Sequence, residues 1–443
     1  MAQNAEELLK RRRNPLPIPA GPNAKSSNKL QECLREMGVR NPRDILHDVL
    51  TQKGERVRHT CEWILNQTKF SIWVAKEDAQ LLRLIGPPGI GKTMMSTFLV
   101  EQLRQKVEKA PGQVLAYFFC DDKNKDRSEP TAILRSLIWQ LLLQRDGLFP
   151  HIQSDFNLQG SSLCNDFSAL WRIFEAMVTD EHAGIVFVII DALDECESSQ
   201  RKGLLQGMRK LFNPSTTARA SRYKFLLTCR PEIRDIEDEL SRVGNSLRMD
   251  SADINNDLSE YIDVKVDCLA DRKSYTEEEK EMVRNALKRG VGGTFLWVSL
   301  MIDDLEEVLR HNVEETLKSL PHGLDATYIK ILNRIPDNNR NTARFVLRCM
   351  VAARRPLRKI EIQTAFATSK LGFALPRQSL AVYDDICSAC SSILYIRDES
   401  SEDDATITFC HQSVKDFLLH DVSSSDRKWY HASRDPKSLV TVL

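Results

Sequence analysis

The 443-residue sequence lacks an excess of either charge, because 62 Lys and Arg residues balance 62 Asp and Glu residues. A protein whose whole surface binds nucleic acid or an anionic membrane needs a basic excess, so this balance argues against both classes. Long apolar runs are also lacking. The run Ile185–Ile190 is far shorter than the roughly 20 residues that a bilayer-spanning helix requires, so no membrane span is predicted.

A secretory signal is missing as well, since the basic triplet Arg11–Arg13 is followed by a proline-rich stretch and not by an apolar segment. The eleven cysteines, from Cys33 to Cys410, are odd in number and follow no regular spacing. These features favour reduced thiols in a cytoplasmic protein. Hydrophobic residues make up 42% and charged residues 28% of the chain, as in ordinary globular domains, which excludes a disordered or collagen-like chain.

Short apolar runs separated by helical patterns predict a parallel sheet that is buried on both faces. The runs are Leu81–Ile85, Gln113–Phe119, Ile185–Ile190 and Tyr223–Thr228. From about residue 253 helical patterns dominate through residue 370, and two strands near the C-terminus then flank an acidic turn, at Ser392–Ile396 and Ala405–Phe409. Helices followed by such a hairpin are typical of a winged-helix module. The predicted fold class is α/β, with an open, mainly parallel sheet followed by a helical domain and a winged-helix domain.

The most specific motif matches the P-loop pattern and lies between the first predicted strand and a predicted helix over residues 94–106. It consists of Gly86, Pro87, Pro88, Gly89, Ile90, Gly91, Lys92 and Thr93. Glycines let the backbone wrap around a phosphate with its N–H groups pointing inward, and the following helix adds partial positive charge. We expect Lys92 to contact the β- and γ-phosphates and the Thr93 hydroxyl to bind Mg²⁺. The motif predicts a P-loop NTPase that binds ATP or GTP with Mg²⁺.

The third apolar strand ends in Asp191, and a carboxylate in that position is costly unless it meets a cation or hydrogen-bond donors. We expect this strand to lie beside the P-loop strand, with Asp191 as a ligand of the magnesium shell. Asp194 and Glu195 follow, and one of them is expected to orient the attacking water and accept its proton. The alternative is that both residues only cap the helix that begins after Cys196.

The fourth strand is followed by Arg230, at the edge where ligands bind in open α/β sheets. Arg230 is therefore expected to sense the γ-phosphate, with a salt bridge to a surface acid as the alternative. Two further clusters are interpreted as non-functional. The pair Cys387 and Cys390 lacks the other two ligands that a zinc site needs, and the charged segment Asp121–Glu129 is expected to be solvated surface.

These residues, in this order, resemble the NACHT family of signal-transduction P-loop ATPases and GTPases, in particular fungal members with a nephrocystin-like N-terminal domain found in heterokaryon-incompatibility proteins. Thr60–Leu65 resembles the segment that leads into the fungal domain, and Asp191–Glu195 has the small residue that usually follows the magnesium Asp in NACHT proteins. Gly292–Val298 resembles the start of a helix that closes over the nucleotide. Phe409–Leu418 resembles the winged-helix signature, which implies that His411 contacts the β-phosphate of bound diphosphate. The alternative is a histidine that is packed in the winged-helix core.

The resemblance implies a domain order: a partly helical leader at 1–50, a nucleotide-binding domain at 51–252, a helical domain at 253–336, a winged helix at 337–420 and a tail at 421–443. Thr294 stands where many relatives have a proline near the base, so the choice between ATP and GTP stays open. Relatives usually also carry an effector domain and C-terminal repeats. We therefore expect either a minimal member or a truncated one.

The implied function is a STAND-type signalling switch that hydrolyses its nucleotide slowly and has an unknown signalling partner. Exchange of diphosphate for triphosphate is expected to open the molecule and permit homo-oligomerisation. The alternative is an interaction scaffold that binds nucleotide without turnover. A small-molecule kinase is not favoured, because no acceptor pocket or lid is recognised. DNA binding is not favoured either, because the last strand and helix of the winged-helix segment are not basic.

Overall fold

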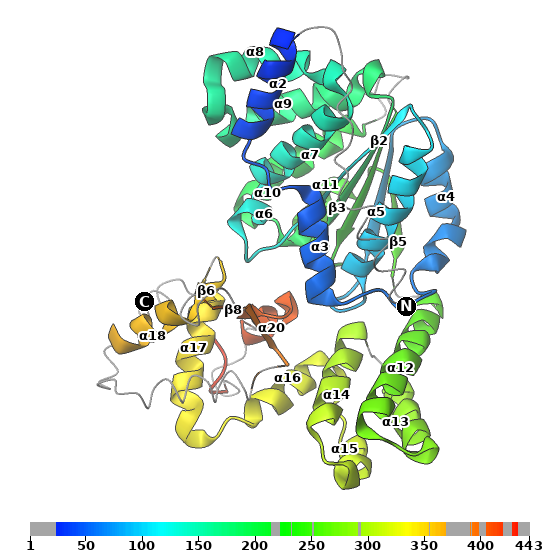
Figure 1. Cartoon of the computed structure of the whole chain (residues 1–443), viewed down its shortest axis with the longest axis vertical. Helices are drawn as coiled ribbons and strands as arrows, with labels where there is room; N and C mark the ends of the chain where they lie inside the picture. The colour runs from blue at the N-terminus through cyan, green and yellow to red at the C-terminus, as the bar shows by residue number, and fades with distance from the viewer. Residues whose placement is uncertain are drawn as a thin grey trace.

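The computed structural model describes residues 24–213, 222–231, 233–249, 252–290, 294–353, 355–368, 390, 392–397, 405–419 and 428–432. The expectations about the leader up to residue 23, about Cys387, Gly292 and Gly293 and about most of the tail lie outside these residues. In Figure 1 the parallel sheet and its helices form the upper body, α12–α15 lie below it, and α17, α18 and a small sheet lie to the lower left.

The main sheet has five parallel strands in the order β2-β3-β4-β1-β5. The predicted apolar runs form four of these strands, because side chains buried on both faces leave few polar positions. The fifth, β5, is short and polar and was not predicted. The strands are β1 (Gln80–Ile85), β2 (Gln113–Phe119), β3 (Ile185–Asp191), β4 (Tyr223–Cys229) and β5 (Asn245–Arg248).

One expectation about the sheet is wrong: β3 does not lie beside the P-loop strand β1, because β4 is inserted between them. The register pairs Ile85 with Cys229 and Ile190 with Leu227. Residues that follow β1, β3 and β4 therefore still meet at one edge. Asp191 reaches the P-loop region across the end of β4 and not as a direct neighbour of β1.

Two layers of helices cover the sheet, since successive strand residues point to opposite faces. Val188 and Ile190 belong to the apolar core with α2 and α7–α10, whereas Phe187 and Ile189 belong to the core with α3, α4 and α5. The covering helices are α2 (Ala24–Glu36), α3 (Pro42–Lys53), α4 (Thr68–Ala75), α5 (Lys92–Glu108), α6 (Lys125–Ser128), α7 (Pro130–Gln144), α8 (Pro150–Gln159), α9 (Phe167–Thr179), α10 (Ser198–Leu211) and α11 (Arg234–Leu240).

The rest of the described chain is mainly helical and shares a third apolar core, which includes residues from Ile262 to Ala432. Its antiparallel sheet has the order β6-β8-β7, and Leu394 pairs with Phe409 as expected for the predicted strands. The elements are α12 (Ala252–Lys273), α13 (Glu277–Arg289), α14 (Phe295–Glu307), α15 (Val313–Lys318), α16 (Gly323–Asn333), α17 (Arg340–Ala352), β6 (Leu357–Arg358), α18 (Lys359–Thr368), β7 (Leu394–Arg397), β8 (Thr406–Phe409) and α20 (Gln412–Leu418).

The structure confirms the α/β class with a mainly parallel sheet followed by helices. The winged-helix assignment of the last part stays a prediction. Within the described residues, no helix combines the length and the apolar character needed to cross a membrane.

Candidate functional site

The P-loop connects β1 to α5 and follows a path that only glycine takes without strain. Gly89 and Gly91 have φ angles of 75° and 90°, and Gly91 caps the helix that begins at Lys92. A Cβ on Gly89 would lie 2.7 Å from the Cβ of Leu296, and the Leu296 amide donates to the Gly89 carbonyl at 3.3 Å. The loop therefore packs closely against the start of α14, where Thr294 forms the N-cap.

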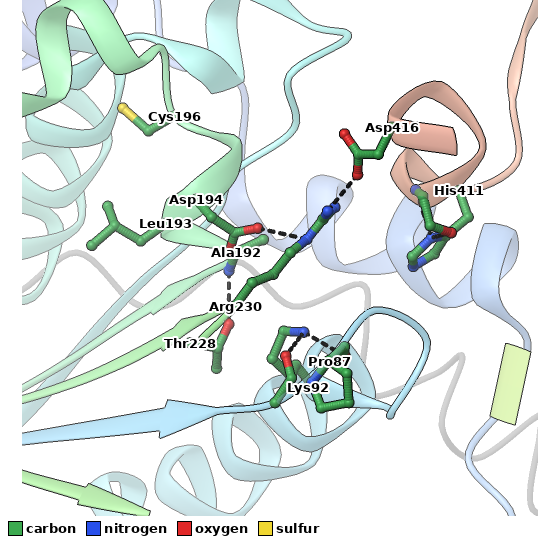
Figure 2. A network of polar contacts seen from close by, with 12 residues as sticks. Pro87, Lys92, Ala192, Leu193, Asp194, Cys196, Thr228, Arg230, His411 and Asp416 are labelled. Carbon is green, nitrogen blue, oxygen red and sulfur yellow. Dashed lines mark hydrogen bonds and ion pairs between the residues drawn. The ribbon is translucent and has the colours of Figure 1, made fainter. Parts of the chain in front are cut away.

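The P-loop lysine is folded back onto its own loop (Figure 2). Lys92 Nζ donates to the carbonyls of Gly86 at 2.6 Å and Pro87 at 2.9 Å. Burial lowers its pKa, and Asp194 opposes that shift. Thr93 is the next residue of the same first helical turn and is partly exposed. The helix N-terminus, the lysine and the threonine hydroxyl thus lie on one short segment, as the motif predicts.

Asp191 is 1% exposed and is held by two hydroxyl groups that the sequence analysis did not assign to the site. Ser96 Oγ of α5 and Thr228 Oγ1 of β4 both donate to its Oδ1 at 2.7 Å. The Thr228 hydroxyl also accepts the Ala192 amide at 2.7 Å, where the chain turns through a left-handed residue with φ of 51°. Both hydroxyls bind Oδ1 and so fix the orientation of the carboxylate, and no hydrogen bond to Oδ2 is seen within the described part of the chain.

The two acids after this turn point to different surroundings. The Asp194 side chain is 5% exposed and pairs with Arg230 Nε at 3.0 Å, whereas its Oδ1 is buried without a hydrogen-bond partner among the described residues. Burial raises the pKa of Asp194, against the effect of Arg230 and Lys92. Glu195 lies beside Asp121 and Asp122 instead, and burial together with these acids raises its pKa to about 8.

Arg230 links the carboxyl edge of the main sheet to α20. Its side chain is 13% exposed, and it pairs with Asp194 through Nε and with Asp416 of α20 through Nη1 (Figure 2). The predicted surface salt bridge is therefore present in part, since Asp416 is 45% exposed. The other acid, Asp194, is buried, and the role of Arg230 as a γ-phosphate sensor stays a prediction.

His411 precedes α20 and is half-buried against the same edge of the sheet. Its Nδ1 accepts the Ser413 amide at 3.1 Å and lies 2.7 Å from the Ser413 hydroxyl, which in turn contacts the Tyr328 hydroxyl. Burial holds its pKa well below the usual range, and four cations add to this, namely Lys53, Lys123, Arg230 and Lys92. A neutral ring whose Nδ1 accepts a hydrogen bond carries its proton on Nε2, by inference from this hydrogen bonding.

Two lysines in this group were missed by the sequence analysis. Lys123 Nζ donates to the Phe409 carbonyl at 2.7 Å, and Lys53 Nζ donates to the Cys410 carbonyl at 3.4 Å. Asp122 pairs with Lys415 of α20 at 3.1 Å. The expectation that the segment Asp121–Glu129 is solvated surface is therefore wrong for its first residues. Their local sequence resembles any charged turn. Only the tertiary fold brings them to β8 and α20, which we call the C-terminal part.

Comparison with known proteins agrees with the predicted resemblance. Residues 59–230 match the family model described as Nephrocystin 3, N-terminal. The chain is also 28% identical over 417 residues to the vegetative incompatibility protein HET-E-1 of Podospora anserina, which covers 92% of this chain and 29% of that protein. The chain thus spans less than a third of that relative's length. The predicted similarity to NACHT-like fungal proteins is confirmed.

Two solved structures are similar to this chain at a low level. The ORC2 protein of Aeropyrum pernix in its ADP form is 12% identical, with a TM-score of 0.33, over 81% of this chain and 90% of that chain. A Walker-type ATPase of Pyrococcus abyssi is 14% identical, with a TM-score of 0.36, over 82% of this chain and 98% of that chain.

Proposed function

We propose that this chain is a nucleotide-dependent signalling switch that binds ATP or GTP with Mg²⁺, hydrolyses it slowly, and changes its oligomeric state with the nucleotide. The observation that carries the proposal is the double pairing of Arg230. This side chain lies at the edge of the sheet from which the P-loop emerges and binds an acid of α20. A ligand that competes for Arg230 at that edge would act directly on the C-terminal part.

The residues fit a nucleotide with its metal ion. Gly89 and Gly91 give the P-loop its left-handed path, and Oδ1 of Asp194 is a buried acceptor without a donor among the described residues. Residues 86–93 would hold the phosphates, while Thr93 and Asp191 would hold Mg²⁺. The ion would neutralise charge on the phosphate oxygens. Thr228 would act through Asp191 by fixing the orientation of its carboxylate.

Asp194 is the better of the two predicted candidates for orienting the attacking water. Glu195 has a pKa of about 8, so it is largely protonated at neutral pH and is a poor base there. Asp194 is closer to the P-loop lysine, whose charge acts on its pKa. Its pairing with Arg230 weakens it as a base, which is consistent with slow turnover.

His411 would contact the β-phosphate of a bound diphosphate through Nε2 and tie α20 to the nucleotide. This role rests on the resemblance and on the neutral state of the half-buried ring, which four cations favour. We also propose that the domain boundaries lie at residues 252, 336 and 420.

The test is nucleotide hydrolysis by the purified chain, compared with Asp194→Asn, together with particle size in diphosphate and in a non-hydrolysable triphosphate. A switch requires hydrolysis that Asp194→Asn reduces and a size distribution that differs between the two nucleotides. The scaffold alternative is favoured by the Arg230–Asp194 pair, which occupies the proposed base. It requires tight binding without turnover and one size in both nucleotides.

A further inference from the structure

Two lysines far from the C-terminus in sequence meet the chain just before His411. Lys53 is the last residue of α3, and Lys123 follows β2 in the turn before α6. Lys123 Nζ donates to the Phe409 carbonyl at 2.7 Å and Lys53 Nζ to the Cys410 carbonyl at 3.4 Å. The contacts join residues that are separated by 286 and 357 positions, so they exist only when the C-terminal part lies against the nucleotide-binding edge.

This arrangement brings two like charges together. The Lys53 side chain is exposed and the Lys123 side chain is half-buried, and their ammonium groups reach the carbonyls of two neighbouring residues. Like charges at such a separation repel each other, and the charge of Lys123 acts against that of Lys53. The pair is therefore an unfavourable choice for stability alone.

The carbonyls they bind belong to the two residues directly before His411. On its other side His411 is fixed by Ser413, through an amide and a hydroxyl, and Ser413 contacts Tyr328. The ring is thus held from both directions along the chain. Of these two supports, only that of the lysines comes from the nucleotide-binding body, as far as the described residues show.

We propose that Lys53 and Lys123 are positioning residues that hold the backbone at Phe409 and Cys410 so that His411 is presented to the phosphates of a bound nucleoside diphosphate. The inference rests on the proposed function, in which His411 retains diphosphate in the closed state. It adds that this retention depends on two ammonium groups that belong neither to the P-loop nor to the segment Asp191–Glu195.

Other contacts keep α20 against the body when one lysine is removed. Lys415 pairs with Asp122, and Arg230 pairs with Asp416. A lysine variant should therefore release the end of β8 and His411 without separating the two parts completely. Its effect should appear in the release of diphosphate more than in the melting temperature.

The test uses the full chain and fluorescent ADP and GDP, with release followed by stopped flow in Lys53→Met, Lys123→Met and the double variant. Lys125→Met is the matched control, since Lys125 is two residues away, 78% exposed and paired only with the nearby Glu129 among the contacts recorded for its side chain. We expect release to accelerate about fivefold for Lys123→Met, the loss of roughly one hydrogen bond, and more in the double variant. The control should release diphosphate at the wild-type rate.

Dependence on His411 separates a positioning role from a general loss of structure. In the His411→Ala background, Lys123→Met should change release less than twofold, because the residue it positions is gone. Lys123→Arg should restore the slow release by keeping a cationic donor, and Lys123→Gln gives a neutral donor if the methionine variant does not fold. Unchanged release in the lysine variants, or equal acceleration with and without His411, would overturn the inference.

Two outcomes distinguish this inference from the proposed function. If the wild-type chain retains neither ADP nor GDP, both the proposed function and the positioning role fail. If the wild type retains diphosphate, His411→Ala releases it quickly and the lysine variants release it slowly, the switch stands and only the positioning role fails.

Discussion

Replacing Asp416 with asparagine tests the coupling between nucleotide and C-terminal part most directly. The change keeps the size of the side chain and removes the charge that holds Arg230 Nη1. The second pair of Arg230, from Nε to Asp194 at 3.0 Å, is left in place. The guanidinium group therefore stays at the edge of the sheet but is no longer tied to α20.

The size of the effect follows from burial. A hydrogen bond to a charged group is worth about 1.5–3 kcal/mol when buried, whereas an exposed ion pair contributes about 0–1 kcal/mol. Arg230 is 13% exposed and Asp416 is 45% exposed, so the pair lies between these limits. We expect Asp416→Asn to cost the closed state about 1 kcal/mol, which is about fivefold in the equilibrium between closed and open states.

The assay is release of fluorescent diphosphate by stopped flow, with affinities for diphosphate and triphosphate measured in parallel. Asp416→Asn should release diphosphate about fivefold faster and shift the preference toward triphosphate by a similar factor, because the two equilibria are linked. Glu314→Gln is a suitable control, since it removes an exposed acid of α15 whose partner Lys318 is four residues away. The same release rate in Asp416→Asn and wild type, or an undiminished effect in an Arg230→Ala background, would refute the reasoning.

Three further changes address the nucleotide site itself. Lys92→Ala should abolish nucleotide binding, because the phosphates lose their side-chain cation, and a fluorescent-nucleotide titration with wild-type affinity would contradict the P-loop assignment. Thr228→Val should leave Asp191 and the Ala192 amide each short of a hydrogen bond. We expect the free energy of unfolding, measured by chemical denaturation, to fall by about 1–3 kcal/mol, and we expect hydrolysis to require more Mg²⁺. Glu195 binds its proton more tightly when folded, with a pKa of about 8 against 4.5, so folding stability should fall as pH rises between these values. The melting temperature of Glu195→Gln should fall less than that of the wild type between about pH 5 and about pH 9. Parallel curves of melting temperature against pH would show that Glu195 is not buried as a neutral acid.

The sequence predicts the strands well because strands that are buried on both faces appear as short apolar runs. β2 begins and ends where its apolar run does, and β1, β3 and β4 differ from their runs by one residue. β5 has no such trace, since Asn245–Arg248 is polar and lies at the edge of the sheet. The strand order also leaves no local trace. The insertion of β4 between β1 and β3 depends on which crossovers the helices make, so the expected neighbourhood of β1 and β3 was wrong.

The residues of the candidate site also fall into two groups, those that the sequence reveals and those that it does not. The P-loop, Asp191 and Arg230 are recognisable because strong patterns or strand ends mark them. Ser96 and Thr228 are single hydroxyls within apolar segments, and no spacing distinguishes them from packing residues. Lys53 and Lys123 lie in charged surroundings that are typical of exposed turns, and they become part of the site only through tertiary contacts.

In the proposed switch, a small change at the phosphates would act on the C-terminal part through this edge of the sheet. The carboxyl ends of β1 to β4 converge at one edge and deliver the P-loop, Lys123, Asp194 and Arg230 to the same place. The C-terminal part meets this edge through polar contacts, including those of Asp416 and of the β8 end, each worth roughly 1 kcal/mol. Contacts of that size add up to a closed state that is favoured by only a few kcal/mol. A γ-phosphate that draws Arg230 away from Asp416 is therefore of the right magnitude to shift the balance, whereas a large apolar interface at this edge would hold the molecule closed in either nucleotide state.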